Sequence, residues 1–391
     1  MDGSNKFDFV IFGASGFTGK LVVEYAFEKY PPSSGFSWAI AGRSKDKLLT
    51  LKNKLNLPEE IEILEVDSND QSSINNMVNK TKIVLTTVGP YQLYGEKIVR
   101  TCASSGTDYL DLCGEPGWMH KIISECSDDA KKSGSRIIFS CGFDSIPFDL
   151  GVLFVQEEAK SKFGAYASTV RGRVRVMDGE FSGGTAASLS ATMAALKTNP
   201  ELFNVLINPF ALCEGFQGVQ QEDDSKPKHD GELGVWVAPF FMAPINTKNV
   251  HRSNTMMGHL YGESFLYDEM FSCGPGEAGQ KKAELISAYN PLLGDKVPKP
   301  GEGPSKESRD SGSYDMLFTG VDDGEIKINV SVKGEGDPGY SSTSKMIAES
   351  ALCLLFDCPE LAGGIYTTAP AMGQKLIDRL EDKDVMHFSE E

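Results

Sequence analysis

The sequence predicts an α/β protein built from two units, an open, doubly wound parallel sheet followed by a second α+β domain. Short apolar runs alternate with amphipathic stretches through the first 150 residues, which is the pattern of βαβ units. A glycine-rich segment lies between the first apolar run and the first amphipathic stretch. The chain has 391 residues, a length typical of about two to three domains.

Six strands are expected in the first unit, residues 1–150, because each is a short run rich in β-branched or aromatic residues. They cover residues 7–12, 36–41, 61–66, 82–87, 109–112 and 136–140. Helices are expected between them, among them residues 17–29, which two prolines end, and residues 45–55, where leucines share one face. Strands that alternate with helices lie parallel, so these elements predict a Rossmann fold.

The pattern changes after residue 150, and we place the α+β domain at residues 151–340. Strands are expected over 170–176, 265–271 and 326–332, and helices over 151–162 and 185–197. Valines alternate with arginines over 170–176, which predicts a strand with one apolar face and one basic face in solvent. Residues 294–313 are rich in Gly, Pro, Lys, Glu and Ser and predict a mobile loop. Further helices are expected over 342–356 and 372–380.

Charge and composition exclude several classes of protein. The 38 Lys and Arg against 55 Asp and Glu give a formal charge of −17, which repels nucleic acid and anionic lipid headgroups. Eight cysteines without a CxxC pair and five histidines without ligand spacing predict neither disulfides nor a metal site. No apolar run reaches the ~18 residues that span a bilayer. The first residues do not resemble a signal or transit peptide, so the expected location is the cytoplasm.

The segment between the first strand and the first helix is the strongest functional signal. Residues 13–19 read Gly-Ala-Ser-Gly-Phe-Thr-Gly, a variant of the dinucleotide-binding fingerprint. Glycines permit a tight turn and close approach of a pyrophosphate, which the unpaired N–H groups of a helix N-terminus bind. The expected cofactor contacts are Gly13, Ser15, Gly16, Phe17, Thr18 and Gly19.

The end of the second strand selects between NAD and NADP. An acidic residue there would bind the ribose 2′-OH, whereas this chain has Arg43 and Ser44. A guanidinium offers a planar set of donors that suits a 2′-phosphate. We therefore expect NADP as the cofactor. Asp67, after the third strand, is expected near the adenine.

Candidates for the chemistry lie after the next strands, because ligands bind outside the carboxyl ends of parallel strands. Val88, Gly89 and Pro90 are expected beside the nicotinamide ribose. Hydride transfer also needs a proton donor or a group that stabilises negative charge. The side chains placed for this are Tyr91, Tyr109, Asp111, Glu115, Asp144 and Ser145, of which Tyr91, Tyr109 and Asp144 are the predicted catalytic residues. Asp144 and Glu115 have an alternative interpretation as helix-capping or turn residues.

Two other mechanisms lack support in the sequence. Tyr-x-x-x-Lys occurs only at Tyr25 and Lys29, in the helix after the phosphate loop, where it is too far from the nicotinamide. No G-x-S-x-G segment is present, which argues against a serine hydrolase.

Taken together, these motifs resemble the saccharopine dehydrogenase-like oxidoreductases. The similar segments are 13–19, 41–44, 87–91, 109–115, 141–151, 182–185, 336–340 and 363–367, so the resemblance covers nearly the whole chain. It implies that C-terminal helices in residues 341–391 return to the Rossmann domain. It also implies relatives among trans-acting enoyl reductases and among proteins of lipid droplets and membranes. Residues 145–147 read Ser-Ile-Pro, where saccharopine reductases have a Pro-Gly turn, which argues against saccharopine as the substrate.

A lipid-like substrate has some support in the composition. Residues 202–213 and 235–245 are apolar and flank a polar segment, 217–232. They are interpreted as an acyl channel, a shallow membrane anchor or part of the second domain's core.

These observations predict an NADP(H)-dependent oxidoreductase that reduces a C=C or C=O bond of an acyl or lipid-like substrate, with the proton from Tyr91, Tyr109 or a water held by Asp144. The alternative is a lipid-droplet or membrane-associated protein, on the cytoplasmic face, that binds NADP without turnover. Saccharopine dehydrogenase activity is a third hypothesis. The sequence leaves open whether the chain forms a homodimer.

Overall fold

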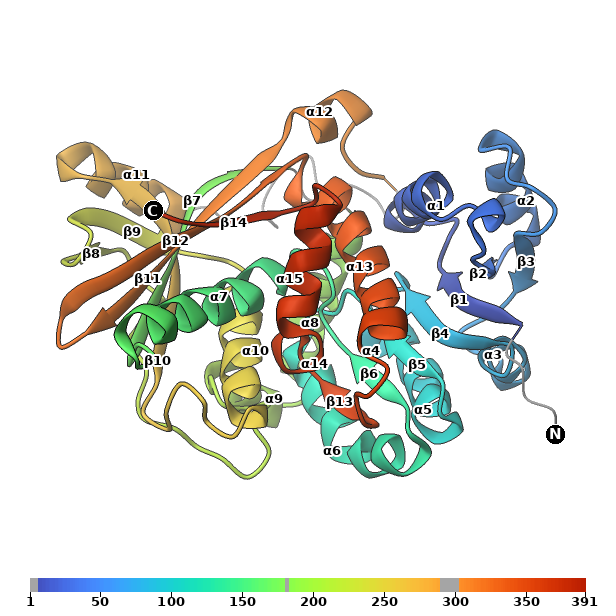
Figure 1. Ribbon diagram of the computed structural model, residues 1–391, viewed down its shortest axis with the longest axis horizontal. Helices are drawn as coiled ribbons and strands as arrows, with labels where there is room; N and C mark the ends of the chain where they lie inside the picture. The colour runs from blue at the N-terminus through green and yellow to red at the C-terminus, as the bar shows by residue number, and fades with distance from the viewer. Residues whose placement is uncertain (1–5, 180–182, 289–301) are drawn as a thin grey trace.

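The computed structural model describes residues 6–179, 183–288 and 302–391. Two sheets lie side by side in Figure 1, with the N-terminal unit at the right and the second sheet at the left. The long helices α7, α13 and α15 lie between the two sheets.

The first sheet has seven parallel strands in the order β13-β6-β5-β4-β1-β2-β3. They are β1 (Phe7–Phe12), β2 (Trp38–Gly42), β3 (Glu62–Glu65), β4 (Thr81–Thr86), β5 (Asp108–Leu110), β6 (Arg136–Ile138) and β13 (Gly364–Tyr366). All six predicted strands are confirmed, and the seventh comes from the C-terminal part of the chain. The strand order reverses beside β1, which pairs with β2 on one side and with β4 on the other. A ligand crevice is expected at such a switch point.

Helices cover both faces of this sheet. They are α1 (Phe17–Lys29), α2 (Lys45–Lys54), α3 (Gln71–Val78), α4 (Tyr91–Tyr94), α5 (Glu96–Ser105), α6 (Pro116–Ser133) and α7 (Ile146–Phe163), with the short turn η1 (Pro32–Ser34) after α1. Neighbouring residues of β1 belong to different core clusters, because Ile11 is in the cluster that includes Val22 of α1 and Val10 is in the cluster that includes Val99 of α5. This explains why the strands are apolar on both faces.

The second sheet is mixed and has the order β14-β12-β11-β7-β10-β9-β8. Its strands are β7 (Thr169–Asp178), β8 (Lys228–Asp230), β9 (Val235–Pro239), β10 (Leu266–Gly274), β11 (Ser313–Asp322), β12 (Glu325–Glu335) and β14 (His387–Glu390). Only β7 and β10 pair in parallel. The predicted strands correspond to β7, β10 and β12.

Five helices belong to the same part of the chain. They are α8 (Gly183–Thr198), α9 (Glu201–Ile207), α10 (Ala243–Met256), α11 (Gly276–Ala288) and α12 (Lys306–Ser311). The prediction of a loop over residues 294–313 is wrong for the helix α12 and for Ser313, which begins β11. Residues 294–301 of that prediction lie outside the described residues.

The C-terminal residues contribute to both sheets. They form η2 (Pro338–Ser342), α13 (Thr343–Leu352), η3 (Cys353–Asp357), α14 (Thr368–Ala371) and α15 (Gly373–Asp382) besides β13 and β14. The buried carboxylate of Glu349, on α13, accepts hydrogen bonds from the hydroxyls of Tyr25 and Tyr30. The C-terminal residues therefore contact α1 through Glu349, add β13 to the first sheet and add β14 to the second sheet. Within the described ranges, no helix combines the length and the apolar character needed to cross a membrane.

Candidate active site

The loop between β1 and α1 has no room for side chains at two of its glycines. Gly13 has a φ of +92°, and a Cβ built on it would lie 2.7 Å from Cγ2 of Val88. A Cβ on Gly19 would lie 2.1 Å from the carbonyl oxygen of Gly13. The amide of Gly16 donates to that same oxygen at 2.8 Å. These contacts shape a tight loop that leads directly into α1.

The N-terminus of α1 suits an anion. Gly16 is the N-cap residue, no side chain caps the helix, and its first turn has no acidic residue. The N–H groups of the first turn and the helix dipole therefore favour a phosphate group at this end. Ser15 faces the end of β2, because its Oγ lies 3.7 Å from a Cβ built on Gly42. The loop has no room for side chains at Gly13 and Gly19, and the helix that follows it has no side-chain cap. This combination fits the binding of a dinucleotide pyrophosphate.

Three predicted cofactor residues follow β2 and β3. Arg43 is exposed, and its guanidinium has no hydrogen bond or ion pair with the described residues. Ser44 instead caps α2, because its Oγ accepts from the amide of Lys47 at 3.4 Å. Asp67 is half-buried and its Oδ1 accepts from the amide of Asn69 at 2.9 Å, which forms an Asx turn. Arg43 is thus the residue here with unused donors for a 2′-phosphate.

The turn after β4 lies against the glycine loop. Thr87 donates from Oγ1 to the carbonyl oxygen of Gly13 at 3.5 Å, and the amide of Val88 donates to Thr86 Oγ1 at 3.2 Å. The peptide between Gly89 and Pro90 is cis. The structure therefore brings this turn next to the glycine loop. The place of Val88, Gly89 and Pro90 beside the nicotinamide ribose stays a prediction.

Glu115 holds this turn in place from the next strand. Its carboxylate accepts from the amides of Tyr91 at 2.8 Å and Gln92 at 2.9 Å, so it caps α4. Glu115 is also the N-cap residue of α6, as the alternative interpretation expected, but its side chain does not cap that helix. Ser188 of α8 also donates to Glu115, at 2.9 Å. Gly89 lies close to the same serine, whose Oγ is 3.7 Å from a Cβ built on that glycine.

The two candidate tyrosines are buried. The Tyr91 hydroxyl donates to Thr86 O at 3.3 Å and accepts from the amide of Leu112 at 3.0 Å. The Tyr109 hydroxyl donates to Asp111 Oδ2 at 2.9 Å. Burial, and then the charge of Asp111, raises the pKa of both phenols far above the usual value. The Tyr91 hydroxyl thus links the ends of β4 and β5, and the Tyr109 hydroxyl is held by Asp111. This geometry disfavours the prediction of either tyrosine as a proton donor.

Asp144 differs from the other candidates because its carboxyl lacks a hydrogen-bond partner among the described residues. The side chain is half-buried, and Oδ2 lies 3.1 Å from a Cβ built on Gly114. Desolvation raises the pKa of Asp144 to about 7. It does not cap a helix, since Ser145 is the N-cap residue of α7. A partly desolvated carboxyl that holds a proton near neutral pH is typical of a general acid or base.

A buried network fixes the residue next to Asp144. Ser145 donates from Oγ to Asn246 Oδ1 at 2.6 Å and accepts from Asn249 Nδ2 at 2.8 Å. Asn246 donates in turn to Glu269 Oε1 at 2.7 Å, and burial raises the pKa of Glu269 to about 8. Asn246, Asn249 and Glu269 lie on α10 and β10. No local pattern in the sequence marks this link between the two units.

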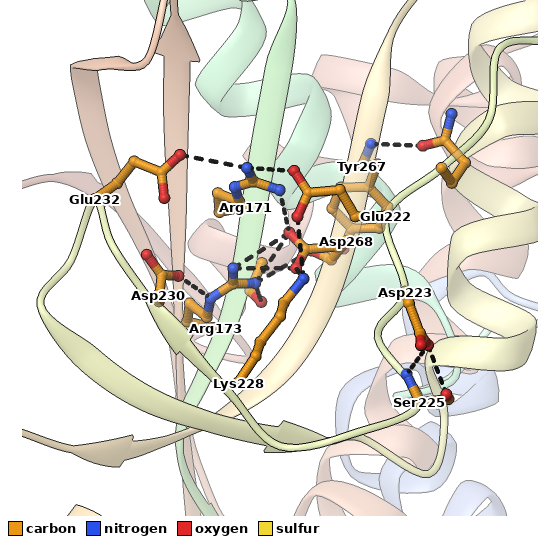
Figure 2. Close-up of polar contacts among 12 residues, drawn as sticks. Arg171, Arg173, Glu222, Asp223, Ser225, Lys228, Asp230, Glu232, Tyr267 and Asp268 are labelled. Carbon is orange, nitrogen blue, oxygen red and sulfur yellow. Dashed lines mark hydrogen bonds and ion pairs between the residues drawn. The ribbon is translucent and has the colours of Figure 1, made fainter.

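The arginines of β7 do not face solvent. Arg171 and Arg173 are buried, and Figure 2 shows them surrounded by acidic side chains. Arg173 Nε lies 2.7 Å from Asp230 Oδ2, and its Nη2 lies 3.1 Å from Asp268 Oδ2. Arg171 pairs with Asp268, Glu222 and Glu232, and Lys228 also pairs with Asp268. The prediction of a solvent-exposed basic face is wrong, because β8 and the segment before it cover this face of the sheet with carboxylates.

Burial alone would raise the pKa of Asp268, but Arg173 and Arg171 outweigh this effect and lower it. The carboxylates in turn keep both arginines charged. Both guanidinium groups are therefore paired with carboxylates of the cluster and are not available to an anionic ligand.

The first sheet, the glycine loop and the strand ends together define a dinucleotide-binding α/β protein of the Rossmann type. The family model described as the saccharopine dehydrogenase NADP binding domain matches residues 9–138. A trans-acting enoyl reductase from Mycobacterium tuberculosis is 33% identical over 411 residues, and one from Mycobacterium ulcerans is 30% identical over 413 residues. Each match covers 97% of this chain and 97% of the relative. Another Mycobacterium tuberculosis protein is 35% identical over 404 residues, with 96% of this chain and 95% of the relative covered.

The solved structures agree on the fold. The apo saccharopine dehydrogenase (L-Glu forming) of Saccharomyces cerevisiae matches with a TM-score of 0.51 at 10% identity, over 98% of this chain and 99% of that chain. The chain belongs to the family of the trans-acting enoyl reductases, and its residues 9–138 form a saccharopine dehydrogenase NADP binding domain. This confirms the predicted fold class, the cofactor NADP and the enzyme class.

Proposed function

We propose that this protein uses NADPH to reduce the C=C double bond of an α,β-unsaturated acyl substrate. The observation that carries the proposal is the carboxyl of Asp144, which lies near the ends of the parallel strands, has no hydrogen-bond partner among the described residues and has a pKa of about 7. The names of the mycobacterial relatives, trans-acting enoyl reductases, support reduction of C=C over C=O.

Such a reduction needs a hydride for one carbon of the double bond, which bound NADPH supplies, and a proton for the other carbon. Protonated Asp144 provides that proton, because a carboxyl with a pKa near 7 is populated in the acid form at neutral pH. The side chain is half-buried, so solvent can return the proton after each turnover. The Ser145 network with Asn246 and Asn249 keeps the adjacent backbone in place.

The environment of the turn after β4 supports an apolar substrate. The helix α8 lies over this turn, where Ser188 donates to Glu115 and Gln92 donates from Nε2 to Thr192 Oγ1 at 3.4 Å. The same helix exposes Leu189 and Met193. These side chains offer apolar contacts to an acyl chain. Arg171 and Arg173 are neutralised by their own carboxylates, which argues against a dicarboxylate such as saccharopine.

We further propose that the substrate is lipid-like and that the protein contacts a membrane or a lipid droplet. The evidence for this contact is the exposed apolar surface of α9. Part of residues 202–213 and 235–245 is buried inside the protein, including Leu212, Val237 and Phe240. Phe203 and Ile207 of α9 are exposed instead. We therefore propose α9 as the part that contacts lipid. Co-sedimentation with neutral phosphatidylcholine vesicles tests this: wild type should pellet and the double variant F203S/I207S should not, whereas wild type left in the supernatant contradicts it.

The reaction is tested with enoyl thioesters of increasing chain length, by the loss of NADPH absorbance. We expect turnover that improves with chain length, no turnover with saccharopine, and a loss of about hundredfold or more in the variant D144N. NADPH binding without oxidation in the presence of any enoyl thioester would contradict the proposal. It would favour the alternative of a protein that binds NADP without turnover.

A further inference from the structure

A segment of the second unit lies directly against the start of α1. Gly303 packs on the ring of Phe17, since a Cβ built on that glycine would be 2.5 Å from Cε1 of the ring. The ring of Tyr340 contacts Phe17 edge to face, with centroids 5.1 Å apart. In Figure 1 the chain that leads into α12 runs beside α1. Residues of the second unit thus contact Phe17, the first residue of α1.

Arg309 is the basic residue that this segment brings to the loop. Its guanidinium carbon lies over the Phe17 ring, 5.5 Å from the centroid. Nη1 donates to Pro304 O at 2.8 Å, and the carbonyl oxygen of Arg309 accepts from the amide of Asp337 at 2.8 Å. The backbone and one side of the guanidinium are therefore fixed in this position.

The rest of the guanidinium has no protein partner in the described part of the chain. Nε is buried and forms no hydrogen bond, and none of the carboxylates in the described ranges lies within ion-pair distance of Arg309. The two nearest candidates are engaged elsewhere, since Asp310 pairs with Lys306 and Asp337 accepts from the amides of Tyr340 and Ser341. A buried donor without a hydrogen-bond partner, such as this Nε, is costly unless a ligand satisfies it.

We propose that Arg309 binds the pyrophosphate of NADP, so that the cofactor is held between the two units. Phe17 is the first residue of α1, whose N–H groups face the same phosphates. Arg43, at the end of β2, occupies the expected place for the 2′-phosphate, so the two arginines serve different phosphate groups. The inference concerns the family's cofactor and does not depend on the proposed substrate.

The experiment measures binding by calorimetry for wild type, R309Q and the control K306Q, with NADPH, NADH and adenosine 2′-monophosphate. Lys306 is one turn away on α12 and is exposed, so K306Q removes the same charge. We expect R309Q to lower the affinities for NADPH and NADH by the same factor, about tenfold or more. The affinity for adenosine 2′-monophosphate should stay unchanged. We expect K306Q to bind all three as wild type does.

Two further measurements separate binding from folding. The ligand-free melting temperature of R309Q should equal that of wild type, and R309K should recover part of the affinity because it keeps the charge. NADP should slow amide hydrogen exchange over residues 306–311 in wild type and not in R309Q. Unchanged NADPH affinity in R309Q, equal weakening in K306Q, or a change in the ratio of NADPH to NADH affinity would each overturn the assignment.

Discussion

The carboxylate of Asp144 stands against the backbone of Gly114, where Oδ2 lies 3.1 Å from the position that a Cβ would take. The glycine leaves space for the carboxyl without offering it a side-chain donor. The pKa of Asp144 is therefore raised to about 7 by desolvation alone. This relationship connects the geometry of the site with two measurable pH effects.

The first effect is on turnover. If protonated Asp144 supplies the proton, kcat/KM for an enoyl thioester should fall about tenfold per pH unit above pH 7. The variant D144N should lose this limb of the profile along with most of its activity. D128N, a change at an exposed carboxylate of α6, should keep the wild-type profile. A profile that stays flat from pH 6 to pH 9 in wild type would exclude this role.

The second effect is on stability. The pKa of Asp144 is raised from 3.8 to about 7 in the folded state, so the folded protein binds this proton more tightly than the unfolded chain does. Stability is then full below pH 4 and is lost as the pH rises toward 7. We expect D144N to be more stable than wild type at pH 8, by about 2 kcal/mol after allowance for the partial exposure of the carboxyl. Denaturant unfolding at pH 5 and pH 8 measures this, and equal stabilities at pH 8 would contradict it.

The glycine loop gives a steric prediction. G19A places a methyl group 2.1 Å from the backbone oxygen of Gly13, so the loop has to deform and NADPH affinity should fall below detection. G231A is the matched control, because nothing lies within 4 Å of a Cβ built on Gly231. Calorimetry and the ligand-free melting temperature measure both variants. Wild-type affinity in G19A would mean that the loop does not bind the cofactor.

Cofactor selectivity depends on Arg43. The variant R43A removes the exposed guanidinium at the end of β2. The affinity for NADPH should fall by about tenfold, while the affinity for NADH should stay constant. The control K54A, at the far end of α2, should change neither affinity. Equal weakening of NADPH and NADH would place Arg43 away from the 2′-phosphate.

The buried ion cluster of β7 predicts strong coupling between Arg173 and Asp230. R173M alone leaves two carboxylates buried without this partner and should lower the free energy of unfolding by about 3 to 5 kcal/mol. The double variant R173M/D230N should recover part of that loss. K281M, which breaks an exposed pair with Glu277, should cost less than about 1 kcal/mol. An additive double variant would show that the pair is not coupled.

The sequence predicted the features that depend on local pattern. The glycines at 13, 16 and 19, the six strands and the basic residue after β2 all follow from spacing and residue type. Other features depend on contacts between distant residues. The side chain of Glu115 caps α4, although Glu115 is the N-cap residue of α6. Arg173 of β7 meets carboxylates about 50 to 100 positions away. Arg309 lies in a stretch whose composition resembles a loop, so no local signal marks its approach to Phe17.

The dependence of the first sheet on β13 and Glu349 has a consequence for synthesis of the protein on the ribosome. The edge strand next to β6 and the carboxylate that accepts from Tyr25 and Tyr30 come from the last 50 residues of the chain. When the first unit has emerged, the edge of β6 and the outer side of α1 are still uncovered. An exposed strand edge of this kind promotes association between chains. Chains truncated before residues 349–366 should therefore expose this edge and aggregate more readily than the full chain.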